Sequence, residues 1–76
     1  MTFSEWLKTR RGRNTRIGDL AGDAARDRQW PADAETLDAF QCRLVHAGAC
    51  REARATLTAA WRAYARAQRR RDAAPM

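Results

Sequence analysis

Apolar side chains recur every three or four residues in four separate segments of the chain. This spacing places them on one face of an α-helix. The pattern predicts four helices, near residues 3–11, 16–28, 34–47 and 51–70. Valine and isoleucine together number two, and strands favour β-branched residues, so no β-sheet is expected. Six side chains should be largely buried between the helices: Trp6, Leu20, Phe40, Leu44, Leu57 and Trp61.

Capping residues stand at the predicted helix starts. Thr2 and Glu5 have the S/T-x-x-E spacing of a capping box, in which each side chain accepts a hydrogen bond from the other residue's backbone N–H. Asn14 or Thr15 suits the start of the second helix, and Asp33 suits the start of the third. These residues therefore support the helix starts that the apolar spacing predicts.

Glycine and proline mark the other boundaries. Gly12 and Gly48 suit the position just after a helix, where a left-handed backbone is common. Gly18 and Gly22 lie four residues apart in the second segment, a spacing that lets a neighbouring helix approach closely. Trp30 precedes a proline that ends this segment, and we expect its side chain to plug one end of the bundle.

Charge is unevenly distributed along the chain. Lysine and arginine number 15 against 9 aspartates and glutamates, a formal net charge of +6. Residues 1–22 carry +3 (five basic, two acidic), residues 23–50 carry −2 (three basic, five acidic) and residues 51–76 carry +5 (seven basic, two acidic). The basic ends favour an anionic partner, and the acidic middle permits head-to-tail association between copies. A chain this short buries a small core, so an enzyme-sized cavity is not expected.

Two groups of basic side chains are candidates for a binding surface. At 100° per residue, five arginines of the last segment fall within an arc of about 100° opposite its apolar stripe. These are Arg51, Arg62, Arg66, Arg69 and Arg70. A second group surrounds the junction of the first two predicted helices: Lys8, Arg10, Arg11, Arg13 and Arg16. Arginine suits bidentate contacts to phosphate or carboxylate. A solvated face in an arginine-rich composition is the alternative interpretation.

Cys42, His46 and Cys50 form the spacing C-x3-H-x3-C. A closed zinc site needs four ligands, and the chain has no further cysteine or histidine. A disulfide is not expected, because Cys42 lies within a predicted helix and Cys50 lies beyond its end. We expect two free thiols, at least one of them buried, and neither a metal nor another cofactor. Free thiols fit a reducing cytoplasm.

Asp19, Asp23 and Asp27 repeat every four residues in the second segment. Paired carboxylates can perform acid–base chemistry, but this spacing more often forms an acidic helix face, with Arg16 and Arg26 in position as partners. The single histidine has no predicted catalytic neighbour, and no glycine-rich phosphate loop is present, so no enzymatic activity is expected. No apolar run is long enough to span a membrane, and the first twenty residues lack a secretion signal.

Four short motifs together resemble one protein family. Phe3–Leu7 looks like its opening F-x-x-W-L, and Ile17–Ala21 is similar to the start of its second helix. Asp27–Pro31 resembles its D-x-x-aromatic-Pro turn, and Ala53–Tyr64 resembles its closing A-x-x-x-(apolar)-x-x-A-W-x-x-Y helix. In this order and spacing, the chain resembles the YozE-type SAM-like domains, a family of short bacterial proteins.

The resemblance implies an all-α fold, a compact four- or five-helix bundle similar to sterile alpha motif domains. The resemblance covers residues 3–64. We assign residues 1–68 to the domain and expect residues 69–76 to form a basic tail that frays, because the end of the chain is rich in alanine and arginine. The family implies no catalytic residues, and its biochemical role is largely undefined. Ser4 stands where the family pattern usually has an aromatic residue, and the C-terminal end is richer in arginine than the pattern requires.

We therefore expect a small, non-catalytic bacterial binding module in the cytoplasm. One hypothesis is non-specific contact with nucleic-acid phosphates through the two basic groups. The other is a protein-interaction module that binds an acidic protein partner, associates with itself or inhibits a host protein.

Overall fold

The computed structural model describes residues 1–73, which form four helices: α1 (Phe3–Lys8), α2 (Arg16–Arg26), α3 (Leu37–His46) and α4 (Arg51–Ala73). No strand occurs in this part of the chain, so the predicted all-α fold class is confirmed. None of these helices is both long and apolar enough to cross a membrane. Residues 74–76, the end of the predicted tail, lie outside the described residues.

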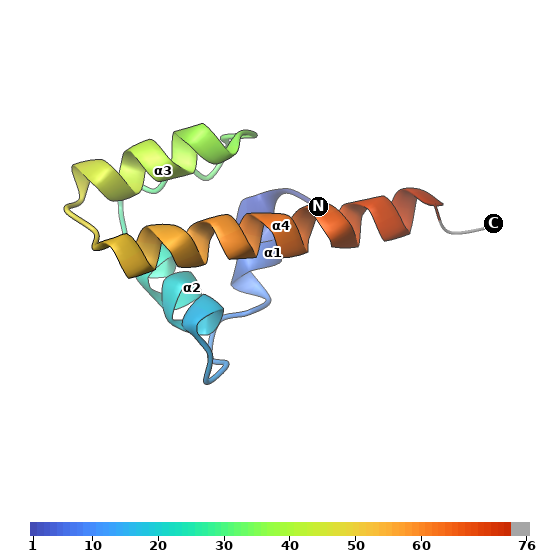
Figure 1. The fold of residues 1–76 in the computed structure, drawn as a ribbon, viewed down its shortest axis with the longest axis horizontal. Coiled ribbons are helices and arrows are strands. Elements are labelled where there is room, and N and C mark those ends of the chain that lie inside the picture. Colours follow the sequence, from blue (N-terminus) through green and yellow to red (C-terminus); the bar gives the residue numbers. More distant parts are fainter. Residues whose placement is uncertain (74–76) are drawn as a thin grey trace.

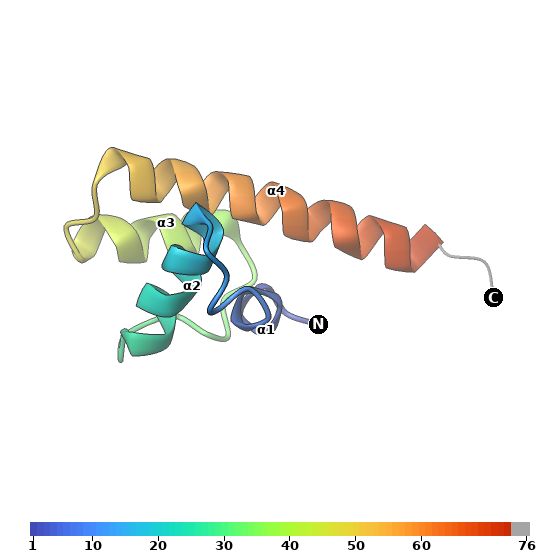
Figure 2. The same cartoon turned by 90° about the horizontal axis from the view of Figure 1, so that it is seen from below.

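The other three helices pack against α4, the longest element (Figure 1). α3 lies beside α4 and runs in the opposite direction, while α2 crosses α4 at a steep angle (Figures 1 and 2). In both views the C-terminal end of α4 projects beyond the other helices. The projection makes the molecule elongated, with extents of 44 × 25 × 21 Å.

The core lies where α1, α2 and α3 meet the first two thirds of α4. Its largest fully buried side chains are Phe3, Leu7, Phe40 and Leu57. Phe3 is central, because its ring centroid lies 4.9 Å from that of Phe40 and 5.2 Å from that of Trp61. Tilted aromatic pairs at these distances add to the stability gained by burying apolar area.

Of the six side chains predicted to be buried, Trp61 is the exception. The other five are at least 92% buried. Trp61 packs against the core but is only partly buried, and it lines a depression of about 330 Å³ with Met1 and Glu35. The prediction that Trp61 is largely buried is therefore wrong, because its indole packs against the core but stays partly exposed at this depression.

Threonine side chains begin three of the helices. The Glu5 N–H donates to Thr2 Oγ1 and the Thr2 N–H donates to the Glu5 carboxylate, both at 3.1 Å, so the predicted capping box is confirmed. The Thr2 N–H holds the pKa of the Glu5 carboxyl below its usual value. Thr15, one of the two predicted candidates, caps α2 by accepting from the Gly18 N–H at 2.9 Å.

The third helix begins later than predicted. Thr36 caps α3 by accepting from the Ala39 N–H at 3.3 Å, so the prediction of Asp33 as the cap is wrong. Asp33 and Thr36 are both good cap residues, but Asp33 lies within a turn in which the Ala34 N–H donates to the Pro31 carbonyl at 3.0 Å. Trp30 stacks on Phe40 with ring centroids 5.1 Å apart, and the residues that follow it form tight turns.

Gly48 and Gly18 have different structural roles. Gly48 has φ +74, its N–H donates to the Val45 carbonyl at 3.0 Å, and the Ala49 N–H donates to the Leu44 carbonyl at 2.9 Å. This is a Schellman motif, and it ends α3 as predicted. At Gly18, a Cβ atom would lie 2.1 Å from the Arg13 carbonyl oxygen. The close neighbour of Gly18 is thus the α1–α2 loop, not the neighbouring helix that the glycine spacing predicted.

Ser4 is a buried polar residue in α1. It is 7% exposed, and its Oγ accepts a hydrogen bond from Trp30 Nε1 at 3.2 Å. Trp30, which is partly buried, therefore packs against the bundle with a partner for its indole N–H. Ser4, which departs from the family pattern, thus supplies the hydrogen-bond acceptor for the indole N–H of Trp30.

Candidate nucleic-acid interface

Five arginines predicted to share one face of α4 all lie on that helix. We call them the outer arginine face: Arg51, Arg62, Arg66, Arg69 and Arg70. All five side chains are exposed, and among residues 1–73 none of them lies within salt-bridge distance of a carboxylate. At 1.5 Å per residue, the face extends for about 28 Å along the helix. Arg62, Arg66, Arg69 and Arg70 form its dense part, while Arg51 lies apart from them near the helix start, beside the exposed Glu52. The guanidinium groups of this face are available to a ligand.

The opposite side of α4 carries its core contacts. Leu57 and Ala60 are fully buried, and Trp61 and Tyr64 pack on the core from the same side. Substitutions on the outer arginine face therefore remove charge without removing core volume. That separation allows the face to be tested without unfolding the domain.

The second predicted basic group surrounds the α1–α2 loop and is called the junction cluster: Lys8, Arg10, Arg11, Arg13 and Arg16. Four of its side chains are exposed, but Arg10 is partly buried. The Arg10 guanidinium lies over the Trp6 ring, 4.7 Å from the centroid. This cation–π contact gives Arg10 a structural partner, so it is less available to a ligand than its neighbours are.

The start of α2 brings Arg16 of the junction cluster next to α4. Thr15, Arg16 and Ile17 line an open depression of about 360 Å³ together with Ala55, Thr56 and Ala59 of α4. Ala59 precedes Arg62 by three residues and so lies on the same side of the helix. The structure thus places one residue of the junction cluster, Arg16, beside the helix that carries the outer arginine face, although the sequence separates the two predicted basic groups by more than thirty residues.

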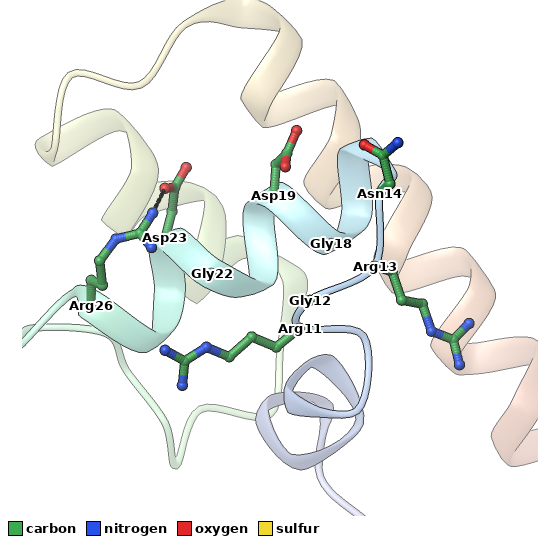
Figure 3. A pocket seen from close by; sticks show the side chains of 9 residues that line it. All are labelled: Arg11, Gly12, Arg13, Asn14, Gly18, Asp19, Gly22, Asp23 and Arg26. Carbon is green, nitrogen blue, oxygen red and sulfur yellow. Dashed lines mark hydrogen bonds and ion pairs between the residues drawn. The ribbon is translucent and has the colours of Figure 1, made fainter.

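A second depression, of about 550 Å³, lies between the α1–α2 loop and α2 (Figure 3). Arg11 extends along it toward the end of α2 that carries Arg26, whereas Arg13 points away from it (Figure 3). Asp19 and Asp23 border it on the other side, and Asp23 pairs with Arg26 at 2.6 Å. Because both signs of charge line this depression, it is a poorer phosphate site than the strip on α4.

The three regularly spaced aspartates have different partners. Asp23 pairs with Arg26, as the spacing suggested, while Asp19 has no ion-pair partner among residues 1–73. Asp27 instead binds Arg43 of α3, and its Oδ1 also accepts from the Gln29 N–H at 2.9 Å. The Arg43 guanidinium, followed by that N–H, holds the pKa of Asp27 below its usual value. Asp27 thus connects two helices and does not belong to a carboxylate site.

The cysteines and the histidine do not form a cluster. Cys42 and Cys50 are free and both are exposed, so the prediction that at least one thiol is buried is wrong. Cys42 falls on the face of α3 turned away from Phe40 and Leu44, which are the buried residues of that helix. Within the described part of the chain, no three His, Cys, Asp or Glu side chains come close enough together to hold a metal ion.

Arg71 is a basic residue that the sequence did not single out. On the helical wheel it falls on the same side as the apolar stripe of α4, about 80° from Trp61. The core contacts of α4 end near Tyr64, however, and α4 continues to Ala73 beyond the bundle. Arg71 is therefore exposed. The helical spacing alone could not reveal this, because it does not show where the other helices end.

The helices and their shared core define a small SAM-like bundle whose arginines lie on its surface. A family model, the YozE SAM-like fold, matches residues 2–66. The chain therefore belongs to the YozE SAM-like fold family, as the sequence motifs indicated. Searches of curated proteins and of solved structures gave no match.

Proposed function

We propose that this protein is a non-catalytic binding module that contacts the phosphates of nucleic acids. The outer arginine face carries the proposal, because it presents five exposed arginines over about 28 Å of one helix. Duplex DNA carries one negative charge per roughly 1.7 Å of its axis, so several phosphates lie within reach of such a strip. Arg16, next to the middle of α4, adds charge to the same side.

The amide side chains support binding without sequence readout. Base recognition commonly uses asparagine or glutamine beside arginine. Gln41 donates to Thr58 Oγ1 at 2.9 Å, and Gln68 donates to the Met1 carbonyl at 3.3 Å. Gln29 accepts from Arg43 at 3.0 Å. These three glutamines have partners within the protein, and Asn14, the remaining amide, lies in the α1–α2 loop and not on the outer arginine face. The proposed contacts are therefore mainly to phosphates, which carry no sequence information.

A protein-interaction module is the second candidate, and one apolar feature favours it. Val45 on α3 is 57% exposed. Leu44, the residue before it, lines a mainly apolar depression of about 220 Å³ with Leu20 and Trp30, and the Asp27–Arg43 pair borders the same depression. An acidic protein, a second copy of the chain or a host protein held for inhibition would use such a surface together with the arginines.

Fluorescence anisotropy with labelled oligonucleotides distinguishes the two candidates. At about 50 mM salt, the protein should bind both duplex and single-stranded DNA, because the proposed contacts do not depend on sequence. Replacing Arg62 and Arg66 with glutamine should weaken binding. The matched control replaces Arg26 and Arg28, which lie off α4, and removes the same net charge.

The control variant should retain most of the affinity, since its arginines lie outside the proposed interface. If the unaltered protein binds no oligonucleotide at this salt concentration, the proposal is wrong and the protein-interaction candidate takes its place. Equal losses in the two variants would show that net charge alone, and not the α4 face, accounts for binding.

A further inference from the structure

The last nine residues of α4 form a helical overhang, defined as residues 65–73. Tyr64 is the last α4 residue packed on the core, and the Gln68 side chain reaches back only to the Met1 carbonyl. At 1.5 Å per residue the overhang is about 13 Å long. Figures 1 and 2 both show it extending past the other helices, so its surroundings are open on most sides.

The arginine side chains of the overhang are distributed over more than half of the helix circumference. With Trp61 at 0° and 100° per residue, Arg69, Arg66, Arg70 and Arg71 fall at about 80°, 140°, 180° and 280°. Asp72 falls at about 20°, on the side opposite Arg70. All five side chains are exposed. A ligand lying along the outer arginine face would contact Arg66 and Arg69 but would leave Arg71 unused.

A groove with negative walls on both sides matches this arrangement. We propose that the overhang enters the major groove of duplex DNA, with Arg69 facing one phosphate wall, Arg71 the other and Arg70 the groove floor. This inference rests on the proposed nucleic-acid function. It specifies duplex DNA as the partner and the major groove as the place where the overhang binds. Asp72 then points out of the groove, away from the phosphates.

The dimensions and the position of the bundle agree with this arrangement. An α-helix with its side chains is roughly 10–12 Å across, and the major groove of B-DNA is about 12 Å wide and 8.5 Å deep. Ala65 and Ala67 keep the overhang slim. On the same angular scale Ala59, which lies beside Arg16, falls at about 160°. Arg16 therefore lies on the side toward which Arg70 points, where it would meet flanking phosphates.

The test compares two duplexes of one sequence, with and without glucosylated 5-hydroxymethylcytosine. The attached sugars fill the major groove and leave the phosphate charge unchanged. We expect the unaltered protein to bind the glucosylated duplex several-fold more weakly. We also expect Arg71→Gln to reduce the salt slope of binding to the plain duplex by about 0.9, as for one lost phosphate contact. Arg28→Gln, which removes the same charge elsewhere, should leave that slope unchanged.

Equal binding to both duplexes, or an Arg71→Gln slope equal to that of the unaltered protein, would overturn groove insertion. The proposed function would survive such a result, because contact through the outer arginine face alone requires neither an open major groove nor a phosphate contact by Arg71. An RNA duplex of the same sequence should bind more weakly than DNA, since the major groove of A-form RNA is narrow; tighter binding to RNA would also overturn the inference. Absence of all oligonucleotide binding would instead refute the proposed function itself.

Discussion

Arg43 of α3 holds Asp27, the residue that ends α2, through two hydrogen bonds. Nε donates to Oδ2 at 2.7 Å and Nη2 donates to Oδ1 at 2.8 Å. Asp27 has an extended backbone, with φ −87 and ψ 110, so α2 stops two residues before the end at residue 28 that the sequence predicted. The pair thereby fixes the end of α2 relative to α3. Because α3 packs beside α4 (Figure 1), the pair also helps to position α4.

This pair makes part of the folding stability dependent on pH. The pKa of Asp27 is lowered in the folded state, so the unfolded chain binds more protons as the pH falls. The stabilisation is complete at neutral pH and is lost as the pH falls below about 4, through the pKa of the folded state. Asp27→Asn should thus lower the urea midpoint at pH 7, and the difference from the unaltered protein should shrink toward pH 2. A difference of the same size at both pH values would contradict this role of Asp27.

Two glycines of α2 should respond in opposite ways to alanine. Gly18→Ala places a Cβ atom 2.1 Å from the Arg13 carbonyl oxygen, so the loop must move, at a cost of about 1–3 kcal/mol. At Gly22 the nearest atom to a new Cβ is the Arg26 guanidinium at 3.6 Å, an ordinary contact. Gly22→Ala should therefore stabilise the helix by about 0.5–1 kcal/mol. Chemical denaturation measures the free energy of unfolding of both variants. A stabilising Gly18→Ala would show that the α1–α2 loop is not packed against Gly18 as described.

The core should be more sensitive at Phe40 than at Trp61. Phe40 is fully buried, and Phe40→Ala should cost about 3–5 kcal/mol, a large part of the stability of a domain this small. Trp61 is larger but only partly buried, so Trp61→Ala should cost less. Thermal unfolding followed by circular dichroism ranks the two variants. A larger loss at Trp61 would mean that its indole is the true centre of the core.

Local sequence signals predicted the starts of α1 and α2 and the end of α3, because the causes of these boundaries are local. The end of α1 was predicted less well, since the helix ends at Lys8 and not near residue 11, before Gly12. Thr2, Thr15 and Gly48 act through hydrogen bonds to residues no more than three or four positions away, and all three act as predicted. The errors arose where a distant residue decides the outcome. The third helix is capped by Thr36 and not by Asp33, after a segment in which Trp30 stacks on Phe40. The second helix ends at Arg26, two residues before the predicted end, and the next residue, Asp27, binds Arg43.

Only part of the candidate surface could be predicted from the sequence, for the same reason. Helical spacing alone placed Arg62 and Arg66 on one face of α4, because the face depends on the period of the helix. It could not show that Arg10 lies over Trp6, or that Arg71 lies beyond the last core contact. Both facts depend on where separate elements meet or end in space.

The salt dependence of DNA binding tests the central claim most directly. The affinity should fall with salt concentration, with a log–log slope of about −0.9 for each phosphate neutralised. Replacing Arg62, Arg66 and Arg69 together with glutamine should flatten that slope by about 2.7 and leave the circular dichroism spectrum unchanged, because all three side chains lie opposite the core. An unchanged slope in the folded triple variant would contradict the claim that the outer arginine face binds nucleic acid.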